Sequence, residues 1–179
     1  MIYCELYGII YAESFAMGDY MEKLLRRVYS SENISLVLKT ISHASVLLCV
    51  LSFLGMLVHF YLASPLLSVK IAFIFAIPFV IVSLVRQLIN APRPYELYDF
   101  YEIKPKRKCG RSFPSRHVFS AFAIASLSFS VSVWLGVALI AIGIALAVAR
   151  VLLGMHFIRD VATGGIIGII SGIIGIVLI

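Results

Sequence analysis

Charged side chains are scarce in this 179-residue chain. Asp, Glu, Lys and Arg together make up 13% of the residues, whereas 61% are hydrophobic. About a quarter of the residues in a soluble domain are charged, so the composition excludes an ordinary soluble globular protein. Cysteine is also rare, and Cys4, Cys49 and Cys109 lack the spacing of a metal site or of a disulfide framework. These absences favour an integral membrane protein without a metal centre.

The N-terminus lacks the cationic region that opens a secretory signal peptide, so no cleaved leader is expected. Residues 1–30 are only moderately apolar and make a poor membrane span. Glu22 and Arg26 form an i,i+4 pair on the side of a helix opposite Leu25 and Val28. This pattern predicts an interfacial or loosely inserted helix.

Long apolar runs are what the sequence has instead. A membrane-spanning helix needs roughly 17–25 apolar residues. We therefore expect an all-α, polytopic transmembrane bundle with five spans, plus the N-terminal interfacial or sixth helix. Residues 1–179 are expected to form one domain, with 1–34 as the N-terminal interfacial region and 35–179 as the catalytic bundle. The five runs cover about 35–62, 66–90, 114–132, 134–153 and 157–179.

Small residues recur along the last two runs. Their spacing lets helix backbones approach closely inside a membrane, so we expect them to mark packing faces. They are Ala138, Ala141, Ala145 and Ala149 with Gly143 in the fourth run, and Gly164, Gly168, Gly172 and Gly175 in the fifth.

The only long polar loop spans about residues 91–113. It is rich in aromatic residues and then in cations. One interpretation is an aromatic belt with ordinary loop charge; the other is a basic rim that attracts anionic lipid headgroups to a site. The residues concerned are Tyr95, Tyr98, Phe100 and Tyr101, followed by Lys104, Lys106, Arg107, Lys108 and Arg111.

Ionisable residues lie between the last two apolar runs, where they are costly and usually functional. On a helix, the spacing of His156 and Asp160 would place the carboxylate beside the imidazole, holding one ring nitrogen and leaving the other free. Arg150 adds a planar cation suited to phosphate or carboxylate. The alternative is a juxtamembrane charge cluster that snorkels and closes an ion pair.

A second polar cluster, Pro114-Ser115-Arg116-His117, opens the third run. Proline and serine are ordinary residues for a helix start. A helix N-terminus is also an anion site, because its free N–H groups and its dipole favour negative charge. A start signal alone would not require the histidine and the arginine.

A third cluster, Arg86 and Arg93, closes the second run. Counting the spans from residue 35 places all three clusters on the same face of the membrane. The topology therefore favours one composite oxyanion site over three unrelated groups of snorkelling side chains.

The three clusters resemble the signature of the type 2 phosphatidic acid phosphatase superfamily. That signature reads Lys-x6-Arg-Pro, then Pro-Ser-Gly-His, then Ser-Arg-x5-His-x3-Asp. Here the corresponding stretches are Arg86-x6-Arg93-Pro94, Pro114-Ser115-Arg116-His117 and Arg150-x5-His156-x3-Asp160. The resemblance covers about residues 35–179 and points to the membrane lipid phosphatases of that superfamily.

The resemblance implies a role for each matching residue. His156 would be the nucleophile that forms a phosphohistidine, with Asp160 orienting it. His117 would donate a proton to the leaving lipid oxygen and later activate water. The phosphate oxygens would be bound by Arg86, Arg93, Ser115 and Arg150. Neither a metal nor another cofactor would be needed, because guanidinium groups supply the positive charge.

The sequence departs from the signature at three positions. Arg86 replaces Lys, which keeps the charge but changes a point charge into a forked donor. Ala149 replaces Ser and removes one possible hydrogen bond. Arg116 replaces Gly, so it either contacts a second phosphate or faces the headgroup layer.

We therefore expect a metal-independent hydrolase of the terminal phosphate of a membrane lipid. The order of preference is a polyprenyl diphosphate such as undecaprenyl diphosphate, then phosphatidylglycerol phosphate, then phosphatidic acid. A lipid phosphotransferase and a non-enzymatic lipid-binding or transport bundle are the alternatives, and two histidines argue against the second. No nucleic-acid partner is expected, and the sequence leaves the oligomeric state open.

Two observations disagree about the membrane face on which the site lies. The positive-inside rule places Lys23, Arg26, Arg27 and the basic loop in the cytoplasm. The family resemblance places the active site of bacterial members on the outer face of the cell membrane. Because the loop cations can serve phosphate instead of topology, we expect the outer face.

Overall fold

The computed structural model describes residues 18–97 and 110–179, and the side chains from residue 21 onward within the first range. The described part is helical. Its helices are α2 (Gly18–Tyr29), α3 (Glu32–Ala63), α4 (Pro65–Ile89), α5 (Pro94–Leu97), α6 (Arg116–Ser128), α7 (Val133–Leu152) and α8 (Ile158–Leu178). The expected all-α polytopic bundle is therefore confirmed. Cys4, Cys109 and the loop residues Tyr98, Phe100, Tyr101, Lys104, Lys106, Arg107 and Lys108 lie outside the described residues.

Four helices in the described part are long and apolar enough to cross a membrane, not five: α3, α4 with its continuation to Leu97, α7 and α8. The third expected span is the exception. Instead of covering residues 114–132, α6 runs for only 13 residues from Arg116 to Ser128. It ends there because the chain turns at residues 129–132, where the amides of Val131 and Ser132 both donate to the Ser128 carbonyl.

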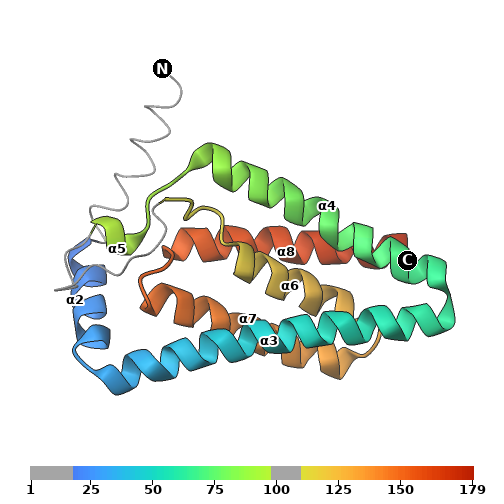
Figure 1. Cartoon of the computed structure of the whole chain (residues 1–179), viewed down its shortest axis with the longest axis horizontal. Coiled ribbons are helices and arrows are strands. Elements are labelled where there is room, and N and C mark those ends of the chain that lie inside the picture. Colours follow the sequence, from blue (N-terminus) through green and yellow to red (C-terminus); the bar gives the residue numbers. More distant parts are fainter. Residues whose placement is uncertain (1–17, 98–109) are drawn as a thin grey trace.

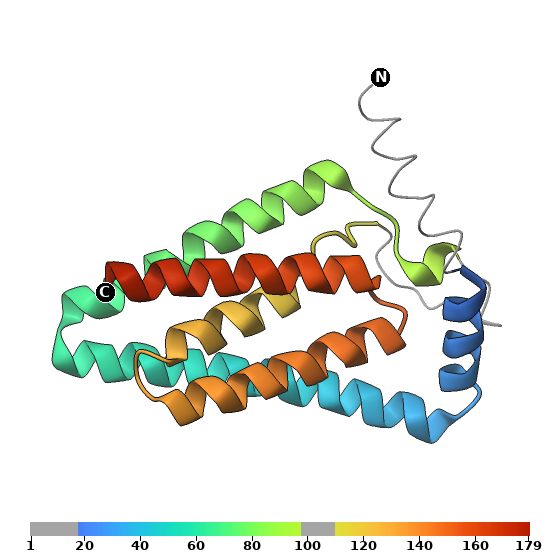
Figure 2. The ribbon, with the colours of Figure 1, turned by 180° about the vertical axis from the view of Figure 1, so that it is seen from behind.

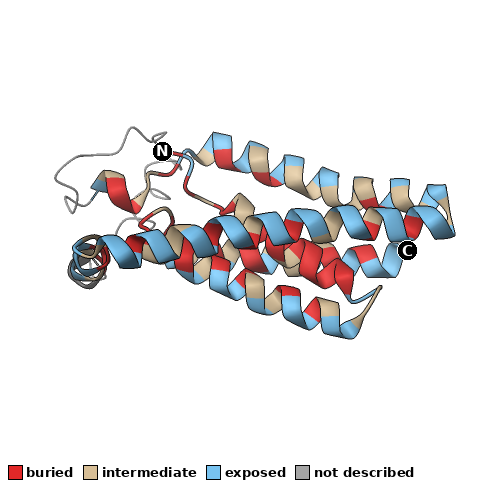
Figure 3. Cartoon of the chain, turned by 60° about the horizontal axis from the view of Figure 1, so that its bottom comes forward, coloured by how far each residue is buried: buried red, intermediate tan, exposed pale blue. Residues whose placement is uncertain are grey.

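Short α6 nevertheless forms the centre of the bundle. It lies between α8 and the α3–α7 pair (Figures 1 and 2), and most of its residues from Val118 to Ser128 are buried. The outer helices α3 and α4 bury only a few of their residues, and buried positions gather on the inward faces (Figure 3). Long helices that expose apolar side chains on their outward faces are suited to contact with lipid.

The glycines of α8 permit its close approach to α6. A Cβ on Gly164 or Gly168 would lie 2.6 Å from the carbonyl oxygen of Ser115 or 2.5 Å from that of Phe119, respectively, and one on Gly172 would lie 2.3 Å from the Cβ of Ser126. The packing role predicted for these glycines is confirmed. For α7 the prediction was partly wrong, because Ala138, Ala141 and Ala145 are exposed while Gly136, Leu139, Gly143, Leu146 and Ala149 are buried.

The predicted amphipathic N-terminal helix is α2, which crosses one end of the bundle (Figure 1). Leu25 and Val28 are buried, while Arg26 and Glu22 form a 2.7 Å ion pair on the outer side. The Tyr29 hydroxyl donates to the Leu153 carbonyl at 3.0 Å. This hydrogen bond ties α2 to the turn between α7 and α8, which carries His156.

Candidate active site

His156 and Asp160 form a fully buried pair at the α2 end of the bundle. His156 Nδ1 lies 3.6 Å from Asp160 Oδ2, and the side chains are 1% and 0% exposed. The expectation of a shared helix is wrong, because α8 begins only at Ile158 and His156 lies in the turn before it. The pair forms all the same, because Asp160 is in the first helical turn of α8 and its carboxylate points back toward the segment before the helix, which holds His156.

Two further donors fix the Asp160 carboxylate. Its Oδ2 accepts a hydrogen bond from the Phe157 amide at 2.9 Å and a short one from the Ser112 hydroxyl. The Ser112 oxygen also lies 3.4 Å from His156 Nδ1. Asp160 and Ser112 therefore occupy the Nδ1 side of the imidazole, which leaves Nε2 as the ring nitrogen available for chemistry.

The surroundings of His156 favour its neutral form. Burial lowers the pKa of His156 below its ordinary value, and the charges of Arg93 and Arg86 act in the same direction. The hydrogen bond and the negative charge of Asp160 oppose this shift. A neutral imidazole has the lone pair that a nucleophile needs.

Ser115 connects the start of α6 to this pair. Its amide donates to the Asp160 carbonyl at 3.0 Å, and its own carbonyl accepts from Phe119 at 2.9 Å. Its hydroxyl does not cap α6, although the residue stands at the N-cap position. That buried hydroxyl has no hydrogen-bond partner among the described residues, so the helix-start explanation does not account for the serine.

Three of the predicted arginines lie at this end of the bundle. Arg86 is 6% and Arg150 8% exposed, and Arg93 is partly buried. Arg93 Nε donates to the Gly110 carbonyl at 3.0 Å, and Arg150 Nη1 lies 3.5 Å from Met155 Sδ. Arg86 Nη1 is buried, and within residues 18–97 and 110–179 it meets no acceptor. A buried guanidinium N–H without an acceptor is costly, and a bound anion would supply that acceptor.

Arg116 and His117 lie on the α4 side of the site. Arg116 Nη1 lies 3.4 Å from the Ser83 hydroxyl oxygen, and its guanidinium carbon lies 5.8 Å from the centre of the Phe79 ring. His117 Nδ1 is buried and has no hydrogen-bond partner in the described part of the chain. Arg116 is thus partly buried against α4, which does not fit the headgroup-facing alternative. Contact with a second phosphate stays a prediction.

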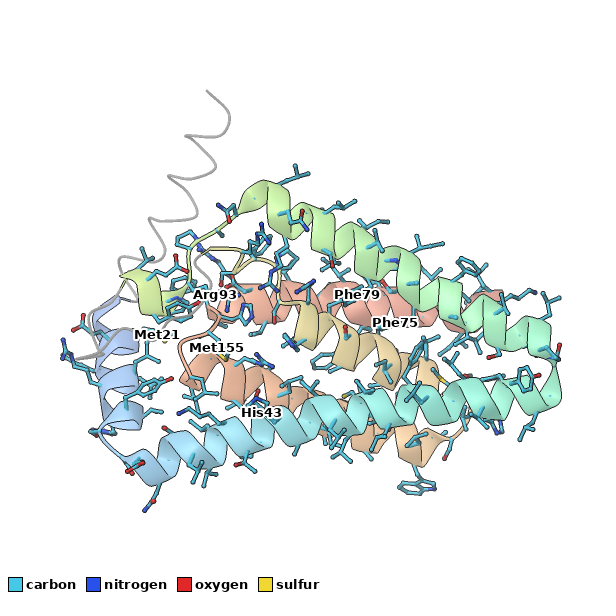
Figure 4. All side chains as sticks on the ribbon, in the orientation of Figure 1. Met21, His43, Phe75, Phe79, Arg93 and Met155 are labelled. Carbon is cyan, nitrogen blue, oxygen red and sulfur yellow. The ribbon has the colours of Figure 1, made fainter. Side chains whose placement is uncertain are left out.

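The structure therefore brings the three predicted clusters together at one end of the bundle. Figure 4 marks this end by Arg93 and Met155, with Phe79 and Phe75 further along α4. Sequence reasoning missed Ser112, Ser83 and Phe79. The only available signal for Ser112 was its position three residues before Ser115, and for the other two it was their helical spacing from Arg86.

A comparison with protein families decides the identity of this fold. The family model described as the PAP2 superfamily matches residues 67–179, which is more than half of the chain. The chain belongs to the PAP2 superfamily. A comparison with curated proteins finds no match.

Solved structures of other proteins share the fold of this PAP2 superfamily member. LpxE of Aquifex aeolicus superposes with a TM-score of 0.63 at 23% identity, covering 86% of this chain and 92% of that one. A PAP2-type phosphatidylglycerolphosphate phosphatase of Bacillus subtilis superposes with a TM-score of 0.66 at 19% identity, covering 95% and 90%. Together with the four long apolar helices, these likenesses make the chain a multi-pass membrane protein.

Proposed function

We propose that this PAP2 superfamily member is a phosphatase that hydrolyses the terminal phosphate of a lipid phosphate or diphosphate through a phosphohistidine. The observation that carries the proposal is the buried His156–Asp160–Ser112 arrangement. Because Nδ1 of His156 faces Asp160 and Ser112, Nε2 is the nitrogen left to attack phosphorus. The site lies at one end of the helical bundle, and this position suits a substrate that resides in the membrane.

The first step transfers the phosphoryl group to the enzyme. His156 Nε2 attacks the terminal phosphorus, and the bond from phosphorus to the leaving oxygen breaks. Asp160 stabilises the positive charge that develops on the imidazole. The leaving oxygen takes a proton from His117. Arg86, Arg93, Arg150 and the Ser115 hydroxyl bind the phosphoryl oxygens and stabilise their charge in the transition state.

The second step releases phosphate. His117 takes a proton from water, and the water oxygen attacks the phosphorus while the N–P bond to His156 breaks. Within the described residues, no three His, Cys, Asp or Glu side chains are grouped to hold a metal ion. The positive charge in the proposed mechanism comes from the arginines, so neither step as proposed requires a metal ion.

Polyprenyl diphosphate, phosphatidylglycerol phosphate and phosphatidic acid are the proposed substrates. A phosphotransferase uses the same first step and passes the phosphoryl group to an alcohol instead of water. The proposed pair of a nucleophile and an acid, His156 and His117, favours turnover over a lipid-binding or transport function, for which the arginines alone would suffice.

Purified protein is expected to release phosphate from at least one of these lipids in the presence of excess chelator. Vanadate should inhibit it, because a trigonal-bipyramidal vanadate adduct mimics the phosphoryl transition state. A malachite-green assay over a panel of lipid phosphates measures both effects. Complete loss of turnover with chelator, restored by Mg²⁺, would contradict the metal-independent mechanism. Transfer to an added alcohol without free phosphate would identify the phosphotransferase instead.

We propose the outer face of the cell membrane for the active site. In a variant with its native cysteines replaced, Asn33→Cys marks the active-site end and Ser130→Cys the opposite end, and both positions are exposed. A membrane-impermeant maleimide added to intact cells should label Cys at position 33 and spare position 130. The reverse pattern would place the site in the cytoplasm, as the positive-inside rule indicates.

A further inference from the structure

Arg116 lies at the polar end of a cavity of about 320 Å³ between α3, α4, α6 and α7. The cavity follows α6 from Arg116 to Ile124, which is about 12 Å along the helix. Arg116, His117 and Ser120 are the polar members of its lining. The remainder is apolar and includes Phe53, Phe75 and Phe79. A cavity with a cationic end and an apolar body matches an amphipathic anion.

Two residues of α4 hold the Arg116 side chain in this position. The Ser83 hydroxyl donates to the Phe79 carbonyl at 2.7 Å, so its proton is already used and its oxygen faces Arg116 as an acceptor. The contact from Arg116 Nη1 to that oxygen is 3.4 Å, longer than a strong N–H···O bond. The Phe79 ring supports the guanidinium from one side. These contacts orient Arg116 but do not use all of its N–H donors.

No described carboxylate neutralises Arg116. Within residues 18–97 and 110–179 its guanidinium contacts the Ser83 hydroxyl and the Phe79 ring, and its Nε is buried without a hydrogen-bond partner. A guanidinium among apolar groups is stabilised by an anion that accepts its remaining N–H groups. The proposed site for the terminal phosphate already has Arg86, Arg93 and Arg150. Arg116 and His117 both line this cavity, so Arg116 lies on the side where the leaving group departs in the proposed mechanism.

We propose that Arg116 is a specificity-determining residue that binds the chain-proximal phosphate of a lipid diphosphate, with Ser83 and Phe79 as positioning residues. This inference rests on the function proposed above. When His156 attacks the terminal phosphorus of a diphosphate, the bond to the bridging oxygen breaks and a lipid monophosphate leaves with the proton from His117. The negative charge of that leaving phosphate grows next to Arg116. A lipid monophosphate has an uncharged alkyl group in the same place.

Arg116→Gln tests the proposal because glutamine keeps a donor for Ser83 and removes the charge. The probes are farnesyl diphosphate and farnesyl monophosphate, which share one chain, in the same detergent. We expect the ratio of kcat/KM for diphosphate over monophosphate to fall at least about tenfold, since hydrogen bonds to charged groups are the strong ones. Arg27→Gln removes a cation from the exposed side of α2 and should leave the ratio unchanged. An unchanged ratio in folded Arg116→Gln would overturn the proposal.

Ser83→Ala provides a second test, which also decides the matter if Arg116→Gln does not fold. We expect the same ratio to fall about threefold, mainly through a higher KM for the diphosphate. Ser83→Thr, which keeps the hydroxyl, should restore it. An equal loss with both lipids would contradict a positioning role. Failure of the unmodified protein to release phosphate from the two farnesyl lipids and from the whole panel of lipid phosphates would refute the proposed function itself. Failure with the two farnesyl lipids alone would refute the proposed role of Arg116 in handling lipid diphosphates, as would turnover with an unaltered ratio in the variants.

Discussion

His156→Ala is expected to abolish phosphate release, by at least about 10³-fold in kcat. The proposed phosphohistidine cannot form without the imidazole, and the neighbouring side chains of Asp160 and Ser112 are committed to each other by a hydrogen bond. Single-turnover and steady-state phosphate release, measured on purified protein, check the loss. Activity within about tenfold of the unmodified protein would refute the phosphohistidine mechanism.

Graded variants separate loss of the nucleophile from loss of the fold. His59→Ala removes an exposed histidine of α3 and should keep full activity. Asp160→Asn should retain the geometry and lose much of the rate, because the developing imidazolium loses its counter-charge. Ser112→Ala should cost less, since Asp160 keeps its hydrogen bond from the Phe157 amide. Size-exclusion profiles in detergent that match the unmodified protein establish that each variant is folded.

Gly168→Val is expected to prevent the bundle from assembling. A Cβ at this position would lie 2.5 Å from the Phe119 carbonyl oxygen and 3.0 Å from the Ala123 amide nitrogen. Both atoms belong to the backbone of α6, which cannot move without displacing Ser115 and His117 as well. Overpacking a well-packed core typically costs about 1–3 kcal/mol, and more where the backbone has to shift. We expect a lower Tm or aggregation, together with loss of phosphate release.

Gly55→Val is the matched control for this substitution. A Cβ on Gly55, in the middle of α3, meets no atom within 4 Å. The same added side chain should therefore leave the Tm and the activity close to those of the unmodified protein. Thermal unfolding followed by fluorescence-detected size exclusion compares the two variants directly. Equal stability of the two would contradict the close α6–α8 contact.

The convergence of the site was predictable because it depends on topology. Apolar runs of the right length fix which ends of the helices share a membrane face, and Arg86, Ser115 and His156 each stand at such an end. The length of α6 was not predictable from hydropathy. The run continues without a break through Ser128–Ser132, where hydroxyls satisfy carbonyls: Ser128 Oγ donates to Ile124 and Ser130 Oγ to Leu127. The average hydropathy of the run therefore does not reveal this turn.

Contacts between distant residues account for the rest of what the sequence left open. The pairing of Ser112 with Asp160 spans 48 positions and that of Arg116 with Ser83 spans 33, and neither follows a helical period. The position of Arg116 depends on how α4 packs beside α6. For that reason the sequence could identify the departure at Arg116 but could not say what this side chain contacts.

The shortness of α6 bears on how the protein meets bilayers of different thickness. Its 13 residues extend about 20 Å, against a hydrocarbon layer of about 30 Å. A lone helix this short would thin the membrane around it or associate with other helices. Here α8 and the α3–α7 pair surround it, so hydrophobic mismatch acts on the four long helices and not on α6. We therefore expect protein contacts, and not the lipid composition of the membrane, to set the depth of His117 and Ser115.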